Sequence, residues 1–515
     1  MKYILFILVI FISFSCGGGN SGSEEENVPT SVVTNRSPVI NGLEDSVTIP
    51  ENQTSVVSVS ASDPETATLT YSLSGTDSIS LSISNTGVIT FNTAPDYESK
   101  NSYSINVNVS DGKASVSQAL IINISDVVEP YQTQLGANLV GEANGDEFGH
   151  SISLSPDGTL LAIGAPGNNN DTGHVRVFLW DGASWTQRGA DIDGEGGGDR
   201  SATSLSISPP TTITGYRIAI GSPISKGYVG NALVYEWNGT AWIKYLSDMT
   251  GGSPQDLSGT SIDMISMGPI VVVGAPFNDQ EGDNAGRVRV WGPSSGTSWG
   301  VRANIADSVA GDQFGTRVSM SLFVEALSGQ ALAISAPHHD QSKGTVKIYQ
   351  FNGVTGNYVQ LGSDIDGEGN GDQSGNSLEL SSDGTTIAIG AILNDGNGND
   401  AGHVRVFAWD GMSWVQRGVD IQGGSAGDQF GADVSLNSDG TILAVSSSQN
   451  NNSKGYVKVY DWNGSSWIQS GNTITGSSSG DSCGNSISLS NDGSILAIGC
   501  PSTGSLPGYA KVYQR

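Results

Sequence analysis

The chain has 515 residues, 70 of them glycine, and 51 acidic side chains against only 22 lysines and arginines, which gives a formal charge of -29. This surplus of acid argues against nucleic acid as a partner, because phosphates are bound by basic patches. Charged residues make up only 14% of the chain, so the acid is not a disordered polyanion and is spread through loops rich in Gly, Asn and Asp.

Residues 1–15 are expected to be an export signal. Met1-Lys2 gives a short positive start, and YILFILVIFISF is an apolar run too short to cross a bilayer as a helix. The run ends at Ser15-Cys16 and is followed by GGGNSGSEEEN, which resembles a bacterial lipoprotein signal. The resemblance implies that Cys16 is lipidated, that residues 16–37 are a flexible tether, and that the protein is exported to the outer membrane or cell surface, where its lipid anchor holds it in the membrane. The alternative is an ordinary cleaved signal peptide with an incidental cysteine.

Residues 38–130 are expected to form a small β-sandwich. Short alternating runs such as SVVSVSAS, TLTYSLS and YSINVNVS are bounded by Asn, Gly, Asp and Pro, which is typical of about seven strands. Acidic residues stand at the strand ends in IPEN, ASDPE, APDYES, VSDG and ISDVVEP, and these motifs resemble those of a cadherin repeat.

The cadherin resemblance implies a cofactor, Ca²⁺, which is bound by carboxylate oxygens that loops bring together. The implied ligands are Glu51, Asp63, Glu65, Asp96, Glu98, Asp111 and Asp126. The alternative is a β-sandwich whose polar loops bind no metal.

Residues 131–515 consist of seven similar units. The aspartate that opens each unit lies at position 146, 199, 256, 312, 372, 428 or 481, a spacing of 53 to 60 residues. Each unit has four strand-like runs, which in the first are HSISLS, TLLAIGAP, GHVRVFLW and SWTQRG. Four antiparallel strands in each of seven units predict a seven-bladed β-propeller.

The two ends of this repeat region are expected to complete one sheet. The last unit stops at GYAKVYQR, after its third strand, and lacks the W-x-Q-R-G segment. Ahead of the first unit lies YQTQLGANLVGEANGD, which aligns with YVQLGSDIDGEGNGD at residues 358–372. Residues 131–136 should therefore supply the missing fourth strand and leave no open sheet edge. The expected fold class is all-β, with a cadherin-like β-sandwich followed by a seven-bladed β-propeller closed by an N-terminal strand.

The turn between the first two strands predicts how they pair. A four-residue loop would put Leu154 opposite Thr159 and, by the same count, Phe148 opposite Ala165. These F-G and G-A-P motifs resemble FG-GAP repeats, the units of the integrin α-chain head, although several units, among them the second and third, lack the Phe. The same count places Cys483 opposite Cys500, which predicts a disulfide in an exported protein. The alternative is two free thiols packed as small apolar side chains.

Several recurring polar and aromatic residues have side chains that could form a site. The ten tryptophans flank one hairpin of the repeat, so they are expected to pack in the scaffold. His174 and His403 stand where other units have Tyr, Arg or Thr, so no catalytic role is expected. His338-His339-Asp340 has metal-ligand chemistry but no second ligand set at a defined spacing.

Acidic loops are expected to gather on one rim. Because strands alternate in direction, the second-to-third and fourth-to-first loops of each unit share a side, and they include NDTG, NDQEGDNAG, NDGNGNDAG and DIDGEG. In the DIDGEG of residues 364–369, Asp364, Asp366 and Glu368 are spaced as calcium ligands, but Asp-Gly is also common in any tight turn.

The resemblance to cadherin and FG-GAP repeats implies a function in cell-surface adhesion or ligand binding that depends on calcium and uses the propeller loops. The expected partner is a protein or glycan ligand, and homophilic and heterophilic contacts remain open. No nucleophile–base pair, paired-carboxylate motif or Gly-rich phosphate loop stands outside the repeat pattern, so an enzyme is not expected. The alternatives are an extracellular propeller hydrolase or lyase acting on a surface polymer, and a structural spacer.

Overall fold

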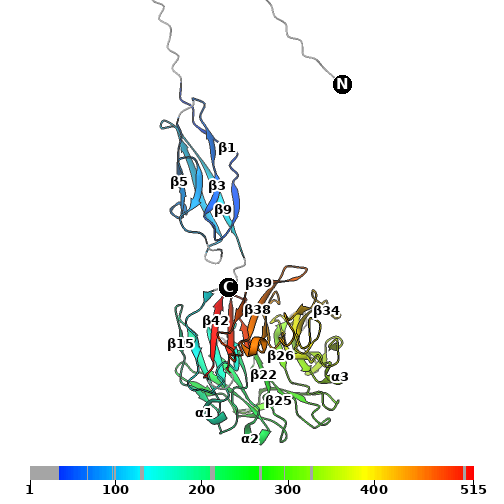
Figure 1. The fold of residues 1–515 in the computed structure, drawn as a ribbon. Helices are drawn as coiled ribbons and strands as arrows, with labels where there is room; N and C mark the ends of the chain where they lie inside the picture. Colours follow the sequence, from blue (N-terminus) through cyan, green and yellow to red (C-terminus); the bar gives the residue numbers. More distant parts are fainter. Residues whose placement is uncertain are drawn as a thin grey trace, which may run out of the picture. The chain divides into compact units, whose positions relative to one another are not determined.

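A computed structural model describes residues 34–515, except 66–67, 96, 98–99, 128–130, 132, 209–214, 266–268, 295, 325–328 and 503–505. The chain divides into two compact units, Met1–Val127 and Val128–Arg515, and both consist mainly of strands (Figure 1). The expected export signal and Cys16 lie outside the described residues. Within the described part, no helix has the length and apolar character needed to cross a bilayer.

The first unit is a β-sandwich. Its strands are β1 (Val39–Asn41), β2 (Ser46–Pro50), β3 (Ser55–Ser58), β4 (Ser60–Ser62), β5 (Thr70–Ser74), β6 (Leu81–Ile83), β7 (Val88–Phe91), β8 (Ser102–Ser110) and β9 (Ser115–Ser125), with a 3₁₀ turn η1 (Ser78–Ser80). One sheet has the order β2-β9-β8-β5 and the other β3-β7-β6, while β1 pairs with β4. Alternate side chains face inward, so that Ile105 and Val107 of β8 share a core with Ile89 and Phe91 of β7. The predicted sandwich is confirmed.

The described part of the second unit contains seven antiparallel sheets, each with four main strands. The first three are β12 (Ser151–Leu154), β13 (Leu160–Ala165), β14 (His174–Trp180), β15 (Trp185–Gln187); β17 (Ser204–Ser208), β18 (Arg217–Ser222), β19 (Asn231–Trp237), β20 (Trp242–Lys244); and β22 (Ser261–Ile265), β23 (Ile270–Ala275), β24 (Arg287–Pro293), β25 (Trp299–Ala306). The next three are β26 (Val318–Val324), β27 (Gly329–Ala336), β28 (Thr345–Asn352), β29 (Asn357–Gln360); β31 (Ser374–Leu380), β32 (Thr386–Ala391), β33 (His403–Trp409), β34 (Trp414–Gln416); and β36 (Val434–Leu436), β37 (Ile442–Ser447), β38 (Tyr456–Trp462), β39 (Trp467–Thr475). The seventh is β40 (Ser486–Leu489), β41 (Ile495–Cys500), β42 (Tyr509–Gln514) and β10 (Thr133–Gln134).

Short elements complete these sheets. Where the fourth strand is interrupted, a second piece pairs with the third strand: β16 (Ile192–Asp193), β21 (Met249–Thr250), β30 (Ile365–Asp366), β35 (Ile421–Gln422) and, in the seventh sheet, β11 (Leu139–Val140). In the described part of the chain, four helical turns lie between second and third strands: α1 (Asn168–Asp171), α2 (Ser225–Tyr228), α3 (His339–Ser342) and α4 (Asn450–Ser453).

The seventh sheet is built from both ends of the unit. Strand β10 pairs antiparallel with β42, with Thr133 opposite Gln514, and β11 pairs with the same strand, with Leu139 opposite Ala510. The backbone N–H of Leu135 also donates to the carbonyl of Val512 at 2.8 Å. The predicted pairing of these two distant segments is therefore confirmed.

Hydrogen bonds join the first strands of the seven sheets in a cycle. In each first strand, one polar side chain accepts a backbone N–H from the first strand of the next sheet, at 2.7 to 3.1 Å. The acceptors, with their donors, are Ser153 (Ile207), Ser206 (Met264), Asp263 (Met320), Ser319 (Leu380), Glu379 (Leu436), Ser435 (Leu489) and Ser488 (Leu154). Because the last bond returns to the first sheet, the series is closed.

The predicted register of the first hairpin is wrong by two residues. Leu154 pairs with Leu161 and not with Thr159. The cause is that Ser155 continues the ladder by donating its N–H to the carbonyl of Leu160 at 2.8 Å. The four-residue loop therefore begins one residue later than the count assumed.

A backbone irregularity after the F-G motif compensates for this error. In the fifth sheet the register shifts between Ser374 and Ser377, and Ser374, which occupies the Phe position, pairs with Ala391. In the seventh sheet, Cys483 and Cys500 occupy the corresponding two positions and are joined by a disulfide. The motif positions therefore face each other, although the count that predicted this used the wrong loop.

The W-x-Q-R-G segment connects neighbouring sheets. Trp237 and Trp242 pack with ring centroids 5.3 Å apart, and the guanidinium of Arg188, from the preceding sheet, lies 4.8 Å from the ring of Trp237. The indole N–H of Trp242 donates to the Arg188 carbonyl at 2.8 Å. Gly189 leaves room for these rings, because a Cβ there would lie 2.9 Å from Trp237. These contacts agree with the scaffold role expected for the tryptophans.

Candidate functional site

The predicted calcium ligands of the first unit lie in two groups. Glu51 is buried, and its carboxylate accepts the backbone N–H groups of Tyr97 and Val127, both at 2.8 Å. These bonds hold the loop at Tyr97 and the segment after β9 at the end of β2, and Asp126 precedes Val127 in that segment. Asp96 and Glu98 lie outside the described residues.

The second group lies next to residues 35 and 36. Glu65 forms an ion pair with Arg36, and one carboxylate oxygen of Asp63 accepts the backbone N–H of Glu65 at 2.8 Å. Asp111 accepts hydrogen bonds from its own turn, from Ala114 and Lys113, and from Asn35, which lower the pKa of its carboxyl group. Among the described residues of this unit, no three acidic side chains converge closely enough to hold an ion.

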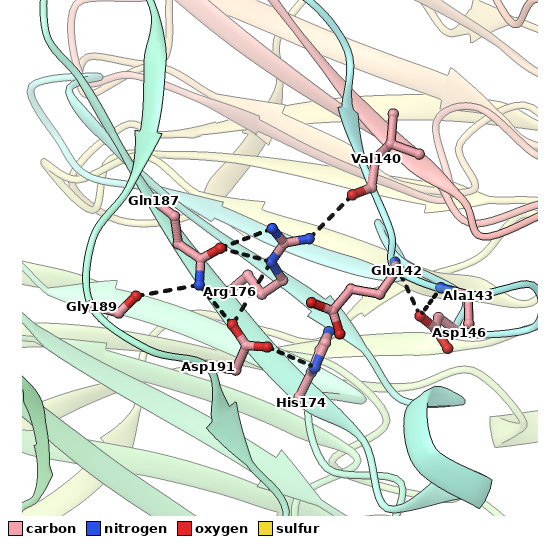
Figure 2. A network of polar contacts seen from close by, with 9 residues as sticks. All are labelled: Val140, Glu142, Ala143, Asp146, His174, Arg176, Gln187, Gly189 and Asp191. Atoms are coloured by element: carbon pink, nitrogen blue, oxygen red, sulfur yellow. Dashed lines mark hydrogen bonds and ion pairs between the residues drawn. The ribbon is translucent and has the colours of Figure 1, made fainter.

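In the second unit, the aspartate that opens most repeats organises its own loop. Asp146 accepts the backbone N–H groups of Glu142 and Ala143 at 3.2 and 2.7 Å (Figure 2). Asp256 accepts the corresponding N–H groups of Gly252 and Ser253. The recurring Asp is thus explained by loop geometry, because a buried carboxylate that accepts backbone N–H groups fixes the turn before the first strand.

Two histidines stand between pairs of carboxylates at one edge of their sheets. His174 is the first residue of β14 and His403 the first of β33, and both side chains are 1% exposed. In each case one Glu comes from the loop before the sheet's first strand and one Asp from the segment after its fourth strand. The groups are Glu142, His174, Asp191 and Glu368, His403, Asp420, and in each group the potential ligand atoms lie within 4.8 Å of one another.

Around His174, both carboxylates approach the imidazole ring. Nδ1 lies 3.7 Å from Oδ2 of Asp191, and the Glu142 side chain also points toward the ring (Figure 2). The other oxygen of Asp191, Oδ1, accepts a hydrogen bond from Gln187 at 2.6 Å and lies 3.8 Å from Nε of Arg176. Arg176 is itself held by Gln187 and by the carbonyl of Val140.

The second group repeats this arrangement. His403 Nδ1 lies 4.0 Å from Oε2 of Glu368 and 4.0 Å from Oδ2 of Asp420. Gln416 donates to Oδ1 of Asp420 at 2.7 Å, and Arg405 lies 4.0 Å from Oε1 of Glu368. Burial and the neighbouring Arg405 lower the pKa of His403.

The sequence pattern did not predict these two groups. No catalytic role was expected for the histidines, because other units carry different residues at that position. The informative signal is the joint presence of Glu, His and Asp in the same unit. The cluster at 338–340 has other contacts: Nδ1 of His339 lies 2.6 Å from Oδ2 of Asp312. The acids of DIDGEG are also separated, because Asp366 accepts a hydrogen bond from Thr345 and Asp364 one from Gln360.

A cavity of about 320 Å³ is lined by the first strands of all seven sheets. Three carboxyl groups line it: Asp263, Glu379 and Asp433. Burial raises the pKa of all three, to about 8 for Glu379 and about 6 for Asp433. Since Asp263 and Glu379 also accept the inter-strand hydrogen bonds described above, they have a structural role in the cycle.

Comparison with known proteins identifies the first unit. Residues 35–123 match the family model of a bacterial Ig domain. None of the curated proteins compared with the chain matches it. The matched range contains all nine strands of the sandwich except the end of β9. The chain therefore carries a bacterial Ig-like domain, which suggests a surface or adhesion-type protein.

Proposed function

We propose that this is an exported, lipid-anchored surface protein whose second unit is a seven-bladed β-propeller of the FG-GAP kind that binds a protein or glycan ligand. The bacterial Ig-like domain supports a surface role. The cyclic hydrogen bonds between the first strands and the seven four-stranded sheets support the propeller. A lipid on Cys16 would anchor the tether in the membrane.

The observation that carries the binding role is the packing of loops along one edge of the sheets. The loop between the second and third strands contacts the loop before the next first strand through isolated bridges, such as Gly286 with Phe314 and Gly402 with Phe430. Loops anchored in this way lose little entropy when a ligand binds. A rim of fixed loops on a rigid scaffold is a common place for recognition.

Two loops of this rim carry acidic side chains and no basic ones. The third sheet presents Asp279, Glu281 and Asp283 in one such loop, and the fifth presents Asp395, with Asp400 half-buried. Neither loop contains Lys or Arg. This surface suits basic groups of a ligand, or ligand oxygens bridged by a cation.

Binding by these loops can be tested with a variant whose acidic loop residues are replaced by uncharged amides. The chain with Cys16→Ser would be coupled to beads and tested against bacterial cells, protein surfaces and immobilised glycans. Replacing Asp279, Glu281, Asp283, Asp395 and Asp400 by their amides should weaken binding about tenfold or more. The control, Glu44→Gln with Asp45→Asn in the first unit, should keep it. Unchanged binding by the rim variant would refute the assignment of this face.

Calcium dependence remains a prediction of the cadherin resemblance. In the present arrangement the described carboxylates bind protein donors, so Ca²⁺ would have to replace some of these contacts. Calorimetry with CaCl₂ on the wild-type chain and on Asp63→Ala and Asp111→Ala variants tests this. Absence of heat with the wild type would remove calcium from the proposal.

The central cavity favours one alternative, an enzyme that hydrolyses or cleaves a surface polymer. Glu379 and Asp433 line the same cavity with raised pKa values, as a general acid and a base would require. We assign them a structural role, because Glu379 accepts the N–H of Leu436 and Asp433 that of Ile487. Cleavage of a surface polysaccharide by the wild type and not by Glu379→Gln would favour the enzyme.

A further inference from the structure

We propose that the second unit binds two divalent transition-metal ions of the zinc class. One ion would lie between Glu368, His403 and Asp420, and the other between Glu142, His174 and Asp191. This inference does not depend on the proposed adhesion function, or on calcium in the first unit.

The geometry of the His403 group is that of ligands around a shared centre. Nδ1 is 4.0 Å from one oxygen of each carboxylate, too far for a hydrogen bond. Metal–ligand bonds of about 2.0 to 2.2 Å place two ligand atoms about 3 to 4 Å apart, so small movements would complete the site. Among the described residues, Nδ1 of His403 has no hydrogen-bond partner, although the ring is 99% buried. A buried nitrogen without a hydrogen-bond partner, directed between two carboxylates, calls for an explanation, and a bound metal ion would supply one.

In both groups, the two oxygens of the Asp carboxylate have different partners. In Asp420, Oδ1 is held by Gln416 and Oδ2 faces His403. In Asp191, Oδ1 is held by Gln187 and Oδ2 faces His174 (Figure 2). One oxygen is thus fixed by a neighbouring donor and the other is directed at the ring, as outer contacts orient metal ligands.

The donor set selects the class of ion. Two carboxylates would balance the charge of a dication. In Glu368, Oε1 is the oxygen near Arg405, whereas Oε2 is the one that faces the imidazole ring. An imidazole nitrogen suits zinc and its neighbours, whereas Ca²⁺ prefers an all-oxygen shell. Three protein ligands leave a position for water, and the exposed Glu in each group keeps the site accessible from the rim.

The second sheet provides an internal comparison. It has the same two acids, Glu195 and Asp248, but Asn231 stands in the position of the histidine. There Lys244 forms ion pairs with both carboxylates and Lys226 pairs with Asp248. Where histidine is absent, lysine side chains balance the paired acids.

In the sheets with histidine no lysine pairs with these acids among the described residues. One acid of each group is near an arginine, Asp191 beside Arg176 and Glu368 beside Arg405. The other acid, Glu142 or Asp420, has no Lys or Arg in ion-pair distance in the described part of the chain, which leaves its charge to be balanced by an ion.

The first site would also connect the two ends of the unit. Glu142 follows β11, which belongs to the seventh sheet, whereas His174 and Asp191 belong to the first sheet and its following segment. An ion held by all three would therefore link the first sheet to the segment that completes the seventh.

The experiment uses the full chain with Cys16→Ser, purified without a polyhistidine tag and stripped with a chelator. Zn²⁺ is titrated by calorimetry and Co²⁺ by its visible absorption, which reports a nitrogen- and oxygen-ligated ion. Wild type should bind two ions, one per group. Either His403→Asn or His174→Asn should bind one, and the double variant none. Asn is chosen because the second sheet carries Asn231 at this position.

The matched control is His339→Asn, which removes a histidine bound to Asp312 and should keep both ions. If an Asn variant fails to fold, Glu368→Gln with Asp420→Asn removes the same site while retaining the ring. The proposal would be overturned if the wild type showed no Co²⁺ absorption at about 100 µM metal, a concentration well above the dissociation constant expected for a preformed site. Equal binding by the double variant would also overturn it.

Discussion

Replacing Phe148 by Ala should strongly destabilise the second unit. Phe148 is fully buried in the segment before the first sheet, yet it packs in one cluster with Ala510 and Val512 of the seventh sheet. Its ring also meets Phe178 edge-on at 6.3 Å. Truncation would leave a cavity between the first and last sheets, and the surrounding strands, held by hydrogen bonds on both sides, can collapse little. We therefore expect a loss of about 3 to 5 kcal/mol in the free energy of unfolding.

Calorimetry can measure this loss in the larger of the two unfolding transitions. For a unit of this size we expect the midpoint to fall by about 4 to 8 °C, extrapolating from the known dependence on chain length. The control Val415→Ala, at a side chain that is half-exposed, should change it by about 1 °C or less. A shift no larger than that of the control would show that Phe148 is not enclosed between two sheets.

Three further predictions concern the same unit. Replacing Cys483 and Cys500 by Ala should cost about 3 kcal/mol, because the disulfide closes a loop with a sequence separation of 17, and thermal unfolding with and without reductant checks this. Burial raises the pKa of Glu379 to about 8, so the folded state holds this proton more tightly than the unfolded chain. Stability should therefore fall as the pH rises from about 5 to above 8, and Glu379→Gln should flatten that part of the melting-temperature profile; an unchanged profile would contradict the burial. Gly189→Ala should destabilise the unit more than Gly182→Ala, because both have positive φ but only the first places a Cβ against an indole of the next sheet, and equal melting temperatures would contradict this packing.

The sequence predicted the arrangement of strands well, because it depends on patterns that recur in every unit. The missing W-x-Q-R-G segment at the C-terminal end, and its counterpart at 131–136, predicted the pairing of β10 with β42. The register of the first hairpin was harder to predict from the sequence, because it depends on whether Ser155 forms a further backbone hydrogen bond, to Leu160, between the two strands. The register shift between Ser374 and Ser377 leaves no separate mark in the pattern.

The candidate metal groups were harder to predict, because each joins residues from three separated segments. When the seven units are compared at one position at a time, His174 is only a residue that varies from unit to unit. The structure shows that His174 and His403 each have a Glu and an Asp beside them. In the second sheet, which carries both acids without the histidine, Lys244 forms ion pairs with both of them. Polar sites built from neighbouring loops are visible in a sequence only when several repeat positions are compared together.

The most direct test of the closed arrangement is a cross-link between the two ends of the second unit. Thr133 and Gln514 are both exposed and face each other across the β10–β42 pair, so Thr133→Cys with Gln514→Cys, in the Cys16→Ser background, should form an intramolecular disulfide on mild oxidation. Mass spectrometry of tryptic peptides would detect it, and Thr133→Cys with Val359→Cys, which places the second thiol in the fourth sheet, should give none. A monomer carrying the 133–514 link is the predicted result, whereas free thiols or only intermolecular dimers would contradict the closed ring.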